Sequence, residues 1–127
     1  MTFILFDTSI LIDFLRRKEK TKDVLSKVEA GKLTGVISTV TEAELYAGKE
    51  SSDGKKRDAI VKLIALFRRI NVDSIIAQTA GEFRRDYNSS LLDCIIAATA
   101  LHQKCKLWTK NKKDFEKIKE IEVEEPY

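Results

Sequence analysis

The chain has 127 residues, of which 43% are hydrophobic and 34% charged, and its formal net charge is +3. This length is typical of one domain, and this composition excludes a disordered protein and gives no more than a weak indication of nucleic-acid binding. Two cysteines without CxxC spacing exclude a zinc ribbon or a disulfide framework, so we expect both to be buried thiols in a reducing compartment.

The apolar runs predict one domain over residues 1–127, in which strands alternate with helices. We expect strands over 3–6, 36–38, 71–73, 106–109 and 121–123. We expect helices over 10–17, 21–30, 42–49, 55–70, 75–87, 91–104 and 112–119, with a loop over 51–54. Such alternation is typical of an α/β fold with a mainly parallel central sheet flanked by helices.

Two exclusions concern membranes and secretion. The apolar run at the start of the chain stops at Asp7 and has no basic segment before it, so it does not resemble a signal peptide. No apolar segment reaches the length that spans a bilayer. We therefore expect a cytoplasmic protein that does not associate with membranes.

Four acidic residues lie where predicted strands end or predicted helices begin. Asp7 directly follows the first strand, and Glu44 falls in the first turn of the helix after the second strand. Asp93 falls in the first turn of the most apolar helix, and Asp114 comes soon after the fourth strand. Because ligands bind beyond the carboxyl ends of parallel strands, we expect these carboxylates to converge at that edge of the sheet.

Each acid also has a purely structural interpretation. Thr41-x-x-Glu44 and Ser90-x-x-Asp93 fit the capping box, in which an acid satisfies amide groups at a helix start. Asp7 is an equally acceptable N-cap residue. A carboxylate has two oxygens, however, so capping and metal ligation are compatible in one residue.

Asp93 distinguishes the two interpretations best. It is flanked by leucine, cysteine and isoleucine in a helix with little polar face, where an ionised carboxylate is costly unless it is paired or bound to a metal. Converging carboxylates also repel one another, and a divalent cation removes that repulsion. An all-oxygen ligand set suits Mg²⁺ or Mn²⁺, whereas a single histidine, His102, argues against zinc.

Four segments of the sequence resemble the PIN-domain family and, within it, the VapC toxins. They are Phe6-Asp7-Thr8-Ser9, Thr41-Glu42-Ala43-Glu44-Leu45 with Gly48 behind it, residues 93–100 and residues 109–115. The resemblance covers nearly the whole chain, and the last two segments are its most specific parts. It implies a PIN-like three-layer sandwich.

The resemblance also implies roles for individual residues. Asp7, Glu44, Asp93 and Asp114 would be the catalytic metal ligands, and Ser9, Thr109 and Asn111 would line the site. Glu44 rather than Glu42 matches the family position because it precedes Leu45. The fourth ligand position stays open between Asp114 and Asn111, and both one ion and two ions fit this set.

The implied reaction is Mg²⁺-dependent hydrolysis of RNA by metal-activated water, catalysed by the toxin of a type II, VapBC-like toxin–antitoxin system. An RNA substrate, a cognate antitoxin and a second copy of the chain are the implied partners. Arg16, Arg17, Lys110 and Lys112 are predicted to hold phosphates, the alternative being that they form a solvated face.

Three other functions remain alternatives. A stand-alone PIN nuclease in RNA processing would use the same site, whereas a non-catalytic PIN-fold binding module would retain only the fold. A phosphotransferase with Asp7 as nucleophile is disfavoured, because the acid expected two residues later is Ser9.

Overall fold

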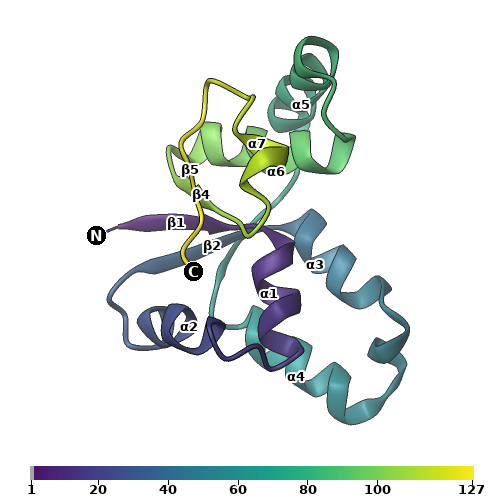
Figure 1. The fold of residues 1–127 in the computed structure, drawn as a ribbon. Coiled ribbons are helices and arrows are strands. Elements are labelled where there is room, and N and C mark those ends of the chain that lie inside the picture. The colour runs from purple at the N-terminus through teal and green to yellow at the C-terminus, as the bar shows by residue number, and fades with distance from the viewer. Residues whose placement is uncertain (1) are drawn as a thin grey trace.

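The computed structural model describes residues 2–127, in which five strands form one parallel sheet between two layers of helices (Figure 1). The strands are β1 (Phe3–Phe6), β2 (Thr34–Ser38), β3 (Arg68–Ile70), β4 (Lys106–Trp108) and β5 (Val123–Glu124). Their order is β3-β2-β1-β4-β5, and every neighbouring pair is parallel. The predicted α/β sandwich with a parallel central sheet is confirmed.

Helices cover both faces of the sheet. One layer contains α1 (Thr8–Leu15), α2 (Thr21–Glu29), α3 (Thr39–Ala47) and α4 (Gly54–Ile64), with the 3-10 turn η1 (Lys49–Ser52) between the last two. The other layer contains α5 (Ser74–Tyr87), α6 (Leu91–Gln103) and α7 (Lys112–Phe115). The two layers lie below and above the sheet in Figure 1.

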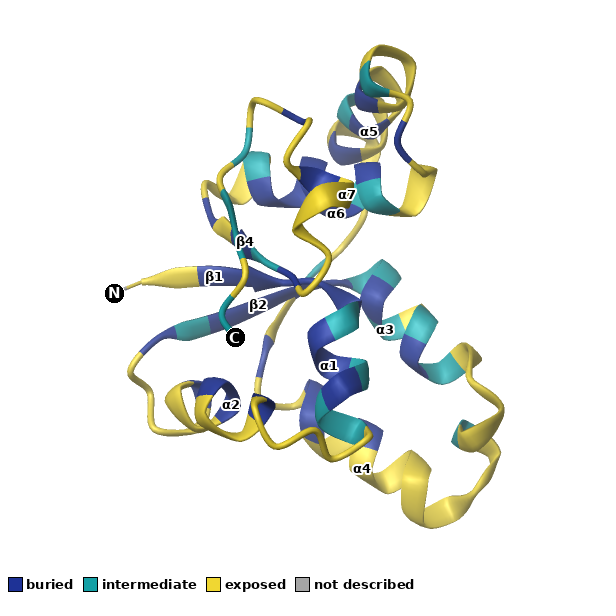
Figure 2. Ribbon diagram, in the orientation of Figure 1, coloured by how far each residue is buried: buried dark blue, intermediate teal, exposed yellow. Residues whose placement is uncertain are grey.

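The apolar core is divided by the sheet, and β1 belongs to both halves. Ile4 and Phe6 pack with α1, α2 and α4, whereas Leu5 between them packs with α5 and α6. This alternation follows from the two-residue period of a strand, and burial on both faces explains the continuous apolar run. Figure 2 shows the buried residues concentrated in the sheet and on the inward sides of the helices.

The largest error of the sequence prediction concerns β3. The helix predicted over 55–70 ends at Ile64, and its last predicted residues form β3 instead of the strand predicted over 71–73. Arg68 and Arg69 are exposed at the edge of the sheet, so this strand has no apolar run of its own. Its extended conformation comes from pairing with β2, which a local pattern does not reveal.

Smaller differences occur near the C-terminus and in one loop. The last strand is Val123–Glu124 rather than 121–123, and α7 ends at Phe115 rather than at residue 119. The expected loop over 51–54 begins inside η1. Across residues 2–127, no helix combines the length and the apolar character that crossing a bilayer requires.

Candidate metal site at the carboxyl edge of the sheet

The site lies where β1 borders strands that continue the sheet in opposite directions. β1 pairs with β2 on one side and with β4 on the other, so the chain reverses its direction of winding at β1. In open parallel sheets, ligands bind in the crevice beyond the strand ends at such a point. Asp7 directly follows β1, and its N–H donates to the carbonyl oxygen of Trp108 at the end of β4 over 2.9 Å.

Asp7 is buried, and hydroxyl groups hold its carboxylate in place. Ser9 Oγ donates to Asp7 Oδ2 over 2.7 Å, and Thr109 Oγ1 donates to the same oxygen over 2.9 Å. Asp7 occupies the N-cap position of α1, but its side chain makes no capping hydrogen bond. No hydrogen bond within residues 2–127 reaches Oδ1, so this oxygen is available to a ligand.

Glu44 lies beside Asp7 because α3 follows β2 without a loop. Thr8, the residue after Asp7, donates through its hydroxyl to Glu44 Oε1 over 2.7 Å. The buried hydroxyl of Thr41 lies 2.9 Å from the same Thr8 oxygen. Because Thr8 directly follows Asp7 in the chain, its hydrogen bond to Glu44 brings the first two predicted ligands near each other.

The capping box predicted for Thr41 and Glu44 is wrong. α3 begins at Thr39, and Ser38 caps it by accepting a hydrogen bond from the N–H of Val40 over 3.1 Å. Glu44 consequently lies in the second turn of α3, not in the first. Its carboxylate therefore does not cap α3 and accepts a hydrogen bond from the hydroxyl of Thr8 instead.

Glu42 and Glu44 have different surroundings, and this difference bears on which of them is the predicted metal ligand. The carboxylate of Glu42 forms an ion pair with Arg69 on β3, with 3.2 Å between the oxygen and the guanidinium nitrogen. Glu44 contacts the hydroxyl of Thr8 next to Asp7 instead. The structure thus places Glu44 near the other predicted ligands and engages Glu42 at the edge of the sheet.

Asp93 lies in the first turn of α6, as predicted. Ser90 caps this helix, because its hydroxyl oxygen accepts a hydrogen bond from the N–H of Asp93 over 3.2 Å. Burial raises the pKa of the Asp93 carboxyl, and a hydrogen bond with Ser90 opposes this effect. The negative charges of Asp7, Asp114 and Glu44 raise the pKa of Asp93 further. All four predicted ligands are therefore close enough to interact electrostatically through Asp93.

The fourth position involves the segment after β4. Asp114 is exposed in α7, and its charge acts on Asp93. Asn111 precedes α7, and its N–H donates to Thr109 Oγ1 over 3.0 Å. The charge of Asp114 thus acts on one of the other predicted ligands, whereas Asn111 is connected to Asp7 through Thr109.

The donor set suits a hard divalent cation. Within residues 2–127, no three acid, histidine or cysteine side chains are close enough together to form a group that could hold a metal ion. Mg²⁺ does not require such a group of three, because it retains several waters and uses one or two carboxylates. His102 lies at the other end of α6 and pairs with Thr79 over 2.8 Å, so zinc-type nitrogen ligation is not available at the four acids.

Known proteins resemble this chain in sequence and in structure. A family model for the PIN domain matches residues 4–121. The chain belongs to the PIN-domain family. It is 32% identical over 124 residues to ribonuclease VapC1 of Methanocaldococcus jannaschii, which corresponds to 93% of this chain and 82% of that protein.

Solved structures show the same PIN fold. The chain is 33% identical to a protein in a toxin–antitoxin complex from Klebsiella pneumoniae, with a TM-score of 0.82 and 98% of each chain covered. A DNA-bound VapBC structure from Salmonella typhimurium is 21% identical, with a TM-score of 0.85 over 100% of both chains. At the latter identity the likeness concerns the fold alone.

The basic residues predicted to hold phosphates do not gather at one place in this PIN domain. Arg16 lines a pocket of about 300 Å³ together with Glu44. Arg17 lines a second pocket beside α2, and Lys112 lines a third beside Trp108. The ammonium of Lys110 pairs with a buried carboxylate of α1 over 3.0 Å. Arg16 is therefore the one of these four that shares a pocket with a predicted ligand.

Sequence reasoning missed three residues around the site. Thr8 contacts Glu44 and its hydroxyl pairs with that of Thr41, and nothing in the local pattern distinguishes these two threonines from ordinary helix-start residues. Asp13, the partner of Lys110, is an acid inside the apolar run of α1. That signal is the same one that identified Asp93, and it would have found Asp13 as well.

Proposed function

We propose that this PIN domain is a Mg²⁺- or Mn²⁺-dependent endoribonuclease and the toxin of a VapBC-like toxin–antitoxin system. The observation that carries the proposal is the convergence of Asp7, Glu44 and Asp114 on Asp93, where burial and these like charges raise the pKa of the carboxyl. Such an arrangement costs stability unless a cation is present, and it is typical of functional sites. The relative named ribonuclease VapC1 supports RNA as the substrate.

Some residues of the site would bind the ion, and others would orient the ligands. Asp7 would present Oδ1 to the ion, because the hydroxyls of Ser9 and Thr109 fix its other oxygen. Thr8 would orient Glu44, and the Ser90 cap fixes Asp93 at the start of α6. The bound ion would neutralise these carboxylates and activate water for attack on phosphorus.

Substrate binding would use Arg16 more than the other predicted basic residues. Arg16 lines the pocket that also contains Glu44, so a phosphate held there would lie next to a metal ligand. Contacts of this kind give salt-dependent affinity and little base selectivity. The choice of RNA target would therefore depend on other parts of the surface.

The partners follow from the relatives. The Klebsiella pneumoniae structure that is 33% identical to this chain is a toxin–antitoxin complex, which supports a cognate antitoxin as partner here. We also propose a homodimer, and the cytoplasm as its compartment. Both cysteines, Cys94 and Cys105, are buried free thiols, which fits a reducing environment.

The test is cleavage of a mixed RNA pool with Mg²⁺, with Mn²⁺ and with EDTA. We expect the wild type to cleave only with metal, and Asp7→Asn and Glu44→Gln to lose cleavage. Glu42→Gln is the matched control, because Glu42 is an acid on the same helix that pairs with Arg69 instead. Cleavage that survives in EDTA, or in Asp7→Asn, would contradict the proposal.

A further inference from the structure

A second buried acid, Asp13, lies near the C-terminal end of α1, and its side chain is 6% exposed. Both of its oxygens have partners from distant parts of the chain. Lys110 Nζ donates to Asp13 Oδ1 over 3.0 Å, and the hydroxyl of Tyr127 donates to Oδ2 over 2.7 Å. One carboxylate thus ties α1 to the segment after β4 and to the end of the chain.

Electrostatics agree with this geometry. Burial raises the pKa of Asp13, but the hydrogen bonds from Tyr127 and Lys110 and the positive charges of Lys110 and Lys18 outweigh it. The pKa of Asp13 consequently lies below its usual value. The carboxylate is therefore ionised at neutral pH, and its interaction with Lys110 is an ion pair.

Lys110 is fixed by its backbone as well as by its side chain. Its N–H donates to Ser9 Oγ over 3.3 Å, and Ser9 Oγ in turn donates to Asp7. The preceding residue, Thr109, donates directly to Asp7, and the following residue, Asn111, donates its N–H to Thr109. The Thr109–Asn111 segment is thus connected to Asp7 at one end of α1 and to Asp13 farther along that helix.

This ion pair competes with the phosphate-binding role predicted for Lys110. If its ammonium moved to a phosphate, the Asp13 carboxylate would be left ionised and buried without its cation. Removing one partner of such a pair is costly, because the remaining charge has lost its compensation. The side chain of Lys110 is 41% exposed, but its charge is directed inward to Asp13.

We propose that Asp13 is a positioning residue for the metal site. Through Lys110 it holds the Thr109–Asn111 segment against α1, and through Tyr127 it holds the end of the chain there, so that Thr109 reaches Asp7 and α7 carries Asp114 toward Asp93. Asp13 itself contacts neither the four acids nor the pocket of Arg16. The inference rests on the proposed function of that site, which is treated separately in the test.

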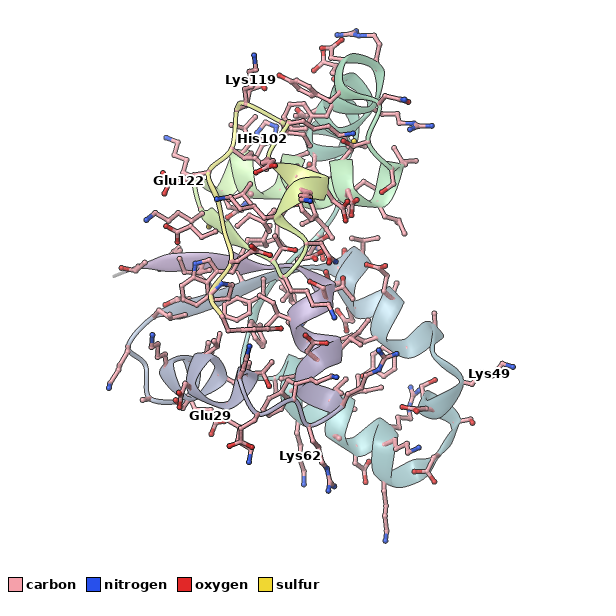
Figure 3. The ribbon with its side chains drawn as sticks, viewed as in Figure 1. Glu29, Lys49, Lys62, His102, Lys119 and Glu122 are labelled. Atoms are coloured by element: carbon pink, nitrogen blue, oxygen red, sulfur yellow. The ribbon has the colours of Figure 1, made fainter. Side chains whose placement is uncertain are left out.

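The functional test compares kcat and KM of Asp13→Asn and Lys110→Met on one RNA that the wild type cleaves. We expect kcat to fall roughly tenfold, the low end for groups that orient metal ligands, with KM nearly unchanged. Lys110→Arg should retain most of the activity, because a guanidinium can pair with Asp13. The control is Lys62→Met, since Lys62 extends outward from α4 (Figure 3).

Two outcomes of this assay would overturn the proposal. In the first, Lys110→Met raises KM and leaves kcat unchanged, which would make Lys110 a contact for RNA. In the second, both variants match the wild type. If Asp13→Asn fails to fold, Lys110→Met alone decides, because it leaves the buried acid and its bond to Tyr127 in place.

Amide hydrogen exchange of the metal-free protein provides a readout that does not depend on catalysis. We expect the amides of Lys110 and Asn111 to exchange several-fold faster in Lys110→Met, while amides of α6 remain as in the wild type. Unchanged exchange at both residues would overturn the positioning role. A wild type that neither cleaves RNA nor binds metal would refute the proposed function instead, and the exchange result would still stand.

Discussion

Asp93 and Asp13 are both acids in apolar helices, and their surroundings have opposite effects. Near Asp93, burial and three like charges raise the pKa, so the ionised form is disfavoured. Near Asp13, a lysine and a tyrosine hydroxyl overcome burial and lower the pKa, so the ionised form is favoured. A cation from outside would relieve the first arrangement, whereas the second already has the ammonium of Lys110. The two pKa shifts therefore have opposite directions because Asp93 is surrounded by like charges and Asp13 by donors and cations.

The largest expected effect is on catalysis by Asp93→Asn. A metal ligand contributes several kcal/mol to transition-state stabilisation, so we expect the cleavage rate to fall by roughly 100-fold or more while the fold is kept. Rates on a cleavable RNA and circular dichroism check both parts. A folded Asp93→Asn protein with normal activity would contradict the assignment of the site.

The next effect is stabilisation by the cation. At a free Mg²⁺ concentration of one hundred times its Kd, binding to the folded state alone raises the free energy of unfolding by about 2.7 kcal/mol. Thermal unfolding with and without Mg²⁺ should show this gain in the wild type and not in Asp93→Asn. A gain of equal size in Asp93→Asn would place the ion elsewhere.

Asp13→Asn should destabilise the protein. It removes the charge from two hydrogen bonds of a buried carboxylate and leaves Lys110 without its anion, which we expect to cost about 1–3 kcal/mol in urea unfolding. Glu42→Gln is a suitable comparison, because its ion pair with Arg69 is exposed and should contribute less than about 1 kcal/mol. Equal losses in the two variants would remove the distinction between the buried and exposed pairs.

The smallest effect has the opposite sign. In metal-free protein, Asp93→Asn should increase stability at neutral pH, by no more than about 1 kcal/mol because solvent screens this half-exposed group. The folded state binds more protons than the unfolded state where the pKa is raised, so the Asp93 penalty grows as the pH rises through that window. Unfolding at neutral pH and near pH 3 tests this, since the advantage of Asp93→Asn should vanish once Asp93 is protonated in both states.

Asp13 should show the reverse dependence on pH. Its folded pKa is depressed, so its contribution is fully present above the unfolded value of about 3.9 and is lost as the pH falls through the folded value. The difference in stability between the wild type and Asp13→Asn should therefore shrink at low pH. A difference that is constant from neutral pH to acid would indicate a packing effect rather than an ionic one.

The sequence predicted the parts of the fold that have a strong local signal. β1 is an apolar run buried on both faces, and α6 is buried along most of its length, so Asp7 could be placed at the end of β1 and Asp93 in the first turn of α6. The exposed strand β3 has no such signal and depends on pairing with β2. The predicted register of Glu44 was wrong because Ser38 already ends β2 and caps α3.

The parts of the site that sequence reasoning missed are long-range contacts. Lys110 and Asp13 are 97 positions apart, and the run of basic residues around Lys110 gave no indication that one ammonium is directed inward. Thr109 was predicted to line the site and Thr8 had no predicted role, and the carboxylates to which they donate became visible only in three dimensions. Local chemistry thus suggested which residues gather, and tertiary structure showed which of them support the others.

The most direct test of the account is calorimetric titration of Mn²⁺ into the wild type, Glu44→Gln and Glu42→Gln. These two glutamates lie on the same helix two residues apart, and only Glu44 contacts Thr8 beside Asp7. We predict that the wild type and Glu42→Gln bind Mn²⁺ with similar affinity, and that Glu44→Gln binds at least roughly tenfold more weakly. A wild type that binds no Mn²⁺, or a Glu44→Gln protein that binds it like the wild type, would contradict the assignment of one metal site to these acids.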